Sequence, residues 1–312
     1  MRTLLLIALG GAVAQLVDGS LGMGFGVTST TMLIALAAMA PASASAVVHV
    51  AQLGTTLASG LSHWKFRNVD WKTALRLGLP GAVGAFAGAT VLSNLSLDAA
   101  KPVTATILTL IGVHLVLRFS RGRRRTAFAA APASGPTLSF LGLFGGFIDS
   151  VGGGGWGPVT SSTLMSIGRA DPRRIVGTVN SAEFLVTLAA SVGFVLGMWS
   201  EIVSHLLAVA GLLVGGMLAA PFAAWLVSKI NPTALGGFVG TMLTLTNIGP
   251  LLALTGITGG AATAIYLLLV AAGASLSLLG IKRSRKKQYS YTESVDSASA
   301  PVEAEQQTKV FH

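Results

Sequence analysis

Three carboxylates and one histidine lie within otherwise apolar stretches of this sequence. They are Asp18, Asp149, Glu183 and His49. Ionisable side chains in such stretches are costly to bury and usually serve a function, such as binding a proton or a charged ligand. A plainer interpretation also stands for each. The two aspartates can cap nearby backbone groups, while Glu183 and His49 can be satisfied by polar neighbours. We take all four as candidates for proton coupling, with Glu183 as the first choice.

A run of glycines follows each aspartate, and the two runs align when the sequence is shifted by 131 positions. The first run lies between Asp18 and Val27, and the second lies between Asp149 and Pro158. Glycine runs interrupt helices, and an interrupted helix within a bilayer is tolerated only where it lines a cavity or a binding site. Interruptions at matching positions of two halves indicate the binding site of a transporter.

The helix that follows each glycine run can bind an anion without a charged side chain. Its free N–H groups and the positive end of its dipole face the interruption. This matters because we find no Lys or Arg deep within a predicted span. We therefore predict a substrate site made of glycine backbone, hydroxyls of the following helices and two side-chain amides. Its residues are Gly22, Gly24, Gly26, Thr28, Ser29, Gln52, Gly153, Gly154, Gly155, Gly157, Thr160, Ser161 and Asn180.

Composition shows what kind of scaffold must position these residues. The chain has 312 residues, of which 52% are hydrophobic and only 10% are charged, whereas soluble domains carry about 25% charged residues. The apolar stretches are about as long as a bilayer-spanning helix needs. The net charge of +10 comes from clusters in short segments between apolar stretches, which indicates cytoplasmic loops and not a nucleic-acid surface. We predict an all-α polytopic membrane protein, and the lack of cysteine excludes thiolate metal sites and thiol nucleophiles.

The repeat extends beyond the glycines, since the same shift aligns His49 with Asn180 and Gln52 with Glu183. We interpret each half as a broken, re-entrant helical hairpin followed by three spans. The hairpins are expected at about 4–17 with 27–40 and at about 137–149 with 157–169. The spans are expected at about 44–62, 76–94, 101–118, 174–197, 203–227 and 233–254, with one further span at about 258–281.

These elements divide the chain into five parts. They are a first transmembrane repeat, a basic cytoplasmic linker, a second repeat, a final transmembrane helix, and a basic cluster with a disordered tail. The boundaries are 1–118, 119–136, 137–257, 258–281 and 282–312. With the basic segments in the cytoplasm, the two halves have opposite orientations, which is the inverted repeat of many secondary transporters. Whether the first hairpin arms cross fully stays open, and with it the side of the N-terminus.

The two glycine breaks and the segment from Pro172 to Glu183 resemble the sulfite exporter TauE/SafE family of membrane proteins. The resemblance covers about residues 4–280. It implies export of sulfite, organosulfonates or related small anions across a bacterial cytoplasmic membrane. The first half departs from the richer glycine run of the second, with Leu21 and Met23 in place of glycines.

Other transport functions stay open at this point. The chain can instead carry a carboxylate, or a cation bound by the three acids, or it can be an anion channel whose breaks form a filter. We find no metal-ligand cluster and no nucleophile with a base, so we expect no enzyme activity, metal or cofactor. The expected partners are a small anion, the lipid bilayer and a proton, while a homodimer stays open.

Overall fold

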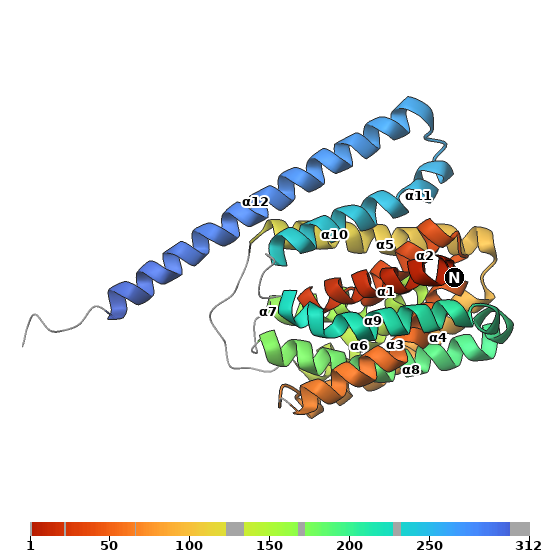
Figure 1. The fold of residues 1–312 in the computed structure, drawn as a ribbon, viewed down its shortest axis with the longest axis horizontal. Helices are drawn as coiled ribbons and strands as arrows, with labels where there is room; N and C mark the ends of the chain where they lie inside the picture. The colour runs from red at the N-terminus through yellow and green to blue at the C-terminus, as the bar shows by residue number, and fades with distance from the viewer. Residues whose placement is uncertain are drawn as a thin grey trace, which may run out of the picture.

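The computed structural model describes residues 2–21, 23–65, 67–122, 134–167, 172–226 and 232–299, and in this part of the chain every regular element is a helix (Figure 1). Five of these helices are long and apolar enough to cross a membrane. They cover Trp71–Asn94, Leu97–Ser120, Arg174–Ser204, Thr233–Leu254 and Gly259–Ser284. The prediction of an all-α multi-pass membrane protein is confirmed.

The first half contains α1 (Arg2–Leu21), α2 (Phe25–Ala37), α3 (Pro41–Lys65), α4 (Trp71–Asn94) and α5 (Leu97–Ser120). The second half contains α6 (Gly135–Gly152), η1 (Gly157–Ser161), α7 (Ser162–Ile167), α8 (Pro172–Ser204), α9 (Leu206–Leu226), α10 (Pro232–Asn247) and α11 (Gly249–Leu254). The last helix is α12 (Gly259–Ser299), which lies along the edge of the bundle against α10 and α5.

Side-chain caps begin several of these helices. Asp70 accepts a hydrogen bond from the backbone N of Thr73, Ser96 accepts one from Ala99, and Ser134 accepts one from Thr137. Each cap satisfies one of the N–H groups that the first turn of a helix leaves without an intrahelical partner.

The first arm of each hairpin is longer than we predicted. α1 has 20 residues and α6 has 18, which at 1.5 Å per residue are roughly 30 Å and 27 Å long. Each helix runs on for three residues past its aspartate, so Asp18 and Asp149 lie inside the last turn. α6 ends only where Gly153 adopts a left-handed conformation with φ 70°, which glycine tolerates at no steric cost.

The C-terminal region and two spans also differ from expectation. α12 continues to Ser299, into the part at 282–312 where we expected a basic cluster and a disordered tail, and 300–312 lie outside the described residues. Most of the predicted linker, 123–133, lies outside them too. α3 and α9 are not among the five spans. In α3 the reason is a set of polar residues that includes His49 and Gln52, both of which are buried in the bundle.

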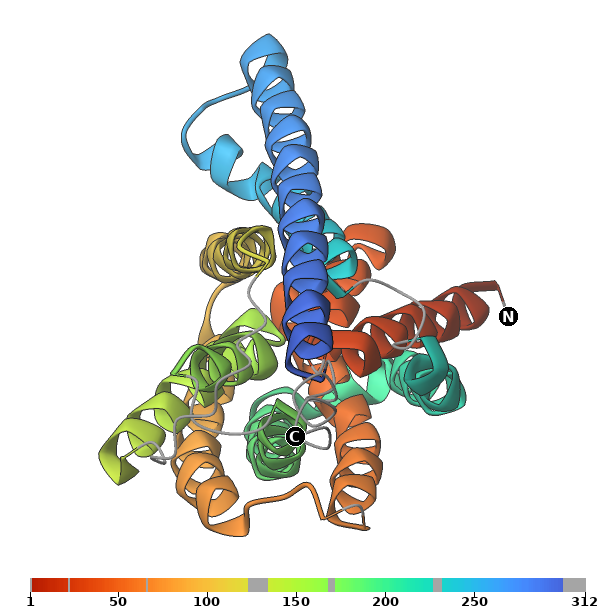
Figure 2. The same cartoon turned by 90° about the vertical axis from the view of Figure 1, so that its left-hand side faces the viewer.

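The first arm of each hairpin packs on a helix of the other half of the chain. α6 packs chiefly on α4, while α1 packs chiefly on α9, and Figure 2 shows these two pairs on opposite sides of the bundle. Glycines let the backbones approach closely in both pairs. A Cβ at Gly146 would collide with the carbonyl of Gly81, and a Cβ at Gly11 would lie 2.6 Å from the carbonyl of Leu212. α8 lies between α3 and α4 and packs on both.

Candidate functional site

The two glycine breaks touch each other in the middle of the bundle. A Cβ at Gly26 would lie 2.7 Å from the Cα of Gly154, and a Cβ at Gly154 would collide with the backbone N of Val27. The hydroxyl of Thr30 donates a hydrogen bond to the carbonyl of Gly153. Gly154 also has a φ of 139°, a conformation that side chains with a Cβ rarely adopt. Only glycine therefore allows this contact.

Asp149 holds the second break together from within the last turn of α6. Its Oδ1 accepts hydrogen bonds from the backbone N of Gly155 at 2.7 Å and of Trp156 at 2.8 Å. Its own carbonyl accepts from the amides of Gly153 and Gly154. The four consecutive backbone amides from Gly153 to Trp156 thus all donate hydrogen bonds to one residue, Asp149. We expected these amides to face an anionic substrate, and in the structure a carboxylate of the chain already occupies two of them.

His49 completes the surroundings of Asp149. Its Nε2 lies 3.1 Å from Oδ2 of Asp149, and the two side chains are 0% and 2% exposed. Its Nδ1 lies 2.8 Å from the carbonyl of Ser45, and because a carbonyl can only accept, Nδ1 carries a hydrogen. The imidazole of His49 thus bridges the backbone of its own helix and the carboxyl group of Asp149.

Asp18 repeats this arrangement in the first break, but with fewer partners. Its Oδ1 lies 3.4 Å from the backbone N of Phe25, which is the same seven-residue step that joins Asp149 to Trp156. The residue aligned with His49 is Asn180, and its amide donates to the hydroxyl of Ser59 at 3.2 Å. The aspartates therefore do cap the broken backbone, and the second break is held more firmly than the first.

A small polar cavity of about 20 Å³ lies beside the first break, with room for about one water. Its lining carries two carboxyls, three side-chain amides, three hydroxyls and one aromatic ring, from Asp18, Glu183, Gln15, Gln52, Asn180, Thr55, Thr56, Ser59 and Phe25. Nε2 of Gln52 lies 3.5 Å from Oε1 of Glu183 across this space. The sequence-predicted Asp18, Gln52, Asn180 and Glu183 thus line one cavity.

Buried hydroxyls surround the breaks. In the described part of the chain, the hydroxyls of Thr28, Ser29 and Ser161 are buried without a hydrogen-bond partner. Thr160 donates to the carbonyl of Trp156 in its own helix. Buried hydroxyls seldom lack partners, so the unpartnered ones are suited to a ligand.

Not every predicted residue contributes equally. His49 and Asp149 pair with each other and do not line the cavity. Gly24, with a φ of 131°, would hold a Cβ 3.2 Å from the side chain of Val17. The amide of Gly155 donates to the carboxylate of Asp149, while Gly157 begins the π-helical turn η1. Gly22 lies outside the described residues. No group of three or more His, Asp or Glu side chains suited to a metal ion occurs in the described part of the chain.

Arg118 is a residue that we did not predict. It lies in the last turn of α5, and its guanidinium donates to the hydroxyl of Ser162. The same guanidinium lies 3.4 Å from the sulfur of Met23. A cation in the last turn of α5 therefore reaches both hairpins. The only signal in the sequence is its position before Phe119, at the end of an apolar stretch.

Comparisons with known proteins agree with this architecture. The family described as "Sulfite exporter TauE/SafE" matches residues 7–249. The chain is 44% identical over 249 residues to "Probable membrane transporter protein YtnM" of Bacillus subtilis (strain 168), which covers 79% of this chain and 82% of that protein. It is 24% identical over 169 residues to "Probable membrane transporter protein YdhB" of the same organism, which covers 54% of this chain and 69% of the relative. No solved structure matches the chain.

Proposed function

The chain belongs to the sulfite exporter TauE/SafE family and is a membrane transporter, and from that premise we propose that it moves small sulfur oxyanions or organosulfonates out across the cytoplasmic membrane. The two halves act as an inverted repeat around the contact between the glycine breaks. Two features support the inverted repeat. The halves exchange their first arms, and Gln52 and Glu183, which occupy the same place in the two halves, contact each other.

The observation that carries this proposal is the cavity at the start of α2. Phe25, the first residue of α2, lines it, so an anion that binds there after the cavity has widened would lie at the positive end of the helix dipole. The amides of Gln15, Gln52 and Asn180 supply N–H donors from three helices, α1, α3 and α8. Since Asp149 already fills the amides of Gly155 and Trp156, the first break is the better site for cargo.

The carboxyls of the cavity couple cargo to protons. An anion in this space meets Asp18 and Glu183, and in a water-poor interior the repulsion between like charges is strong. Protonation of Glu183 removes one negative charge and leaves a hydroxyl that can donate to the cargo. We therefore propose that the anion binds while Glu183 carries a proton, and that His49 and Asp149 serve to hold the second break.

Flux through proteoliposomes tests the function. Vesicles containing the purified protein are loaded with sulfite, a short organosulfonate or a short carboxylate, and flux is followed with and without a pH gradient. We expect saturable flux of the sulfur anions that responds to the gradient. Flux of carboxylates alone would assign a different cargo, and flux that does not saturate would indicate a channel.

One observation favours a second candidate, which is transport of a cation. Asp18 and Glu183 face the same cavity, and two ionised carboxylates would attract a small cation. The substitution Asp18→Asn separates the two functions. It removes a negative charge from the cavity, so it should weaken the binding of a cation and strengthen the binding of an anion. Competition against labelled sulfite in detergent solution measures this difference.

A further inference from the structure

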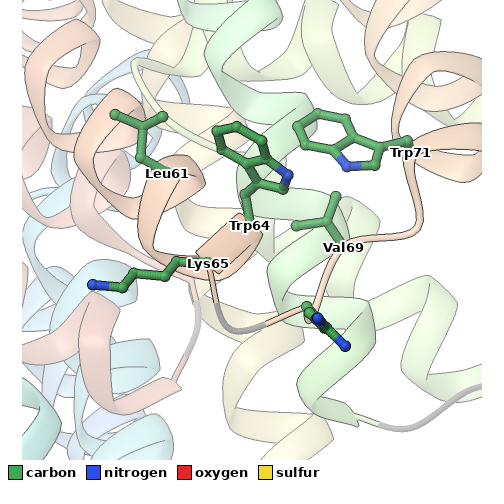
Figure 3. A pocket seen from close by; sticks show the side chains of 6 residues that line it. Leu61, Trp64, Lys65, Val69 and Trp71 are labelled. Atoms are coloured by element: carbon green, nitrogen blue, oxygen red, sulfur yellow. The ribbon is translucent and has the colours of Figure 1, made fainter.

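The connection between α3 and α4 contains a second cavity, remote from the glycine breaks. Its volume is about 620 Å³, and it is lined by Leu61, Trp64, Lys65, Arg67, Val69 and Trp71. Figure 3 shows the two indole rings side by side, with Lys65 extending away from them. Trp64 and Trp71 are 59% and 49% exposed. We propose that this cavity is a binding site for the headgroup of an anionic phospholipid.

The chemistry of the lining matches such a lipid. Tryptophan rings favour the interface between water and hydrocarbon, and Lys65 and Arg67 add two positive charges beside them. An arginine guanidinium binds a phosphate with two parallel hydrogen bonds. Exposed leucines continue from the cavity along both helices, Leu57 and Leu61 on α3 and Leu75 and Leu79 on α4. These side chains would contact the acyl chains of a lipid whose phosphate lies at the two cations.

Arg67 adds an independent reason. It has a φ of 56°, a left-handed conformation in which glycine is favoured and other residues are strained. Its amide bonds the carbonyl of Trp64, and the amide of Asn68 bonds the carbonyl of His63, which together form the usual end of a helix with glycine at this position. An arginine at this position lowers the stability of the protein relative to glycine. We infer that its side chain is retained because it binds a ligand.

The cavity is held in shape by α8. The amide of Asp70 donates to the hydroxyl of Thr178 at 2.9 Å, and a Cβ at Gly177 would lie 2.6 Å from the carbonyl of Asn68. The site is therefore formed before a lipid arrives, which lowers the entropic cost of binding. α8 also carries Asn180 and Glu183 a turn or two further on, so the lipid would contact a loop that rests on the helix of the transport site.

The substitution Arg67→Gly tests the site with two readouts of opposite sign. The melting temperature should rise, because glycine relieves the left-handed strain. The preference for phosphatidylglycerol over phosphatidylcholine, counted by native mass spectrometry of protein released from mixed micelles, should fall by about fivefold. Ala38→Gly is the matched control, since Ala38 ends α2 with a φ of 52°. It should also raise the melting temperature but leave the lipid preference unchanged.

Lys65→Gln keeps the backbone and should lower the same preference. Equal retention of both lipids by the unaltered protein would overturn the proposal, as would an unchanged preference in Arg67→Gly. Displacement of phosphatidylglycerol by millimolar inorganic phosphate or sulfite would also overturn it, because it would assign the cavity to a small anion. None of these measurements depends on transport. The proposal of a lipid site and the proposal of a transport function can therefore be disproved independently of each other.

Discussion

Gln52 and Glu183 are 131 positions apart, and their side chains lie 3.5 Å from each other at the centre of the bundle. This separation equals the shift that aligns the two glycine runs. Residues that occupy the same place in two similar halves can touch only near an axis that relates the halves. The pair therefore supports an inverted repeat whose axis passes between α3 and α8. In the first half this position holds an amide, Gln52, and in the second it holds an acid, Glu183. The two equivalent positions therefore differ in charge.

Glu183→Gln should make flux independent of the pH gradient. The substitution keeps the shape of the side chain and a donor toward the cavity but removes the group that gains and loses a proton. We expect flux under a pH gradient to fall to the level measured without one. Glu201→Gln is the control, because Glu201 is half exposed near the other end of α8. A Glu183→Gln protein that still responds fully to the gradient would assign coupling to another group.

His49→Leu should destabilise the protein by about 3 kcal/mol, because it leaves a buried carboxylate oxygen of Asp149 without its partner. Thermal unfolding in detergent measures the loss as a lower melting temperature. The partly exposed His205 provides a control, since His205→Leu should change the melting temperature little. Adding Asp149→Asn to His49→Leu should restore part of the loss. An unchanged melting temperature in His49→Leu would mean that the pair does not stabilise the break.

Gly154→Ala should abolish transport. The added methyl group would collide with the backbone of the other break at Val27, and the left-handed φ of 139° adds a strain of about 2 kcal/mol. Flux in proteoliposomes and the melting temperature should both fall. Gly260→Ala is a suitable comparison, since nothing lies within 4 Å of a Cβ there. Normal flux in Gly154→Ala would show that contact between the breaks is not needed.

Arg118→Gln should raise the KM for the transported anion more than it lowers the maximal rate. The guanidinium joins α5 to both hairpins through Ser162 and Met23, and we propose that its positive charge attracts the anion. Loss of a charged hydrogen bond also costs about 2 kcal/mol of stability. Arg118→Lys keeps the charge and should retain most of the affinity. Arg121→Gln, at the exposed end of α5, is the control, and equal KM values for the two glutamine variants would remove Arg118 from the transport path.

The arrangement of the breaks could be predicted from the sequence because glycine runs and their spacing report on the backbone. Their contact, and the convergence of Gln52, Asn180 and Glu183, follow from the alignment of the halves. The ends of the first arms could not be predicted as well. A helix ends where the backbone turns left-handed, at Gly153, and a run of four glycines offers several such positions.

The partners of the charged groups could not be predicted, because they come from distant parts of the chain. Asp149 folds back on amides only six and seven residues ahead, but its second partner, His49, is 100 residues away. Arg118 is the last residue of the predicted span at 101–118 and precedes the basic residues Arg121, Arg123, Arg124 and Arg125. Whether a long side chain at the end of a helix turns into the bundle depends on packing that periodicity does not describe.

The exchange of first arms bears on how the protein is made. α1 leaves the ribosome long before its main packing partner, α9, which begins only at Leu206. α1 must therefore remain in the membrane without its partner until the chain has been synthesised as far as α9. α6 differs, because its packing partner α4 precedes it in the chain and has already been synthesised. Assembly of the two hairpins is thus sequential, and α1 reaches its packing partner after α6 reaches its own.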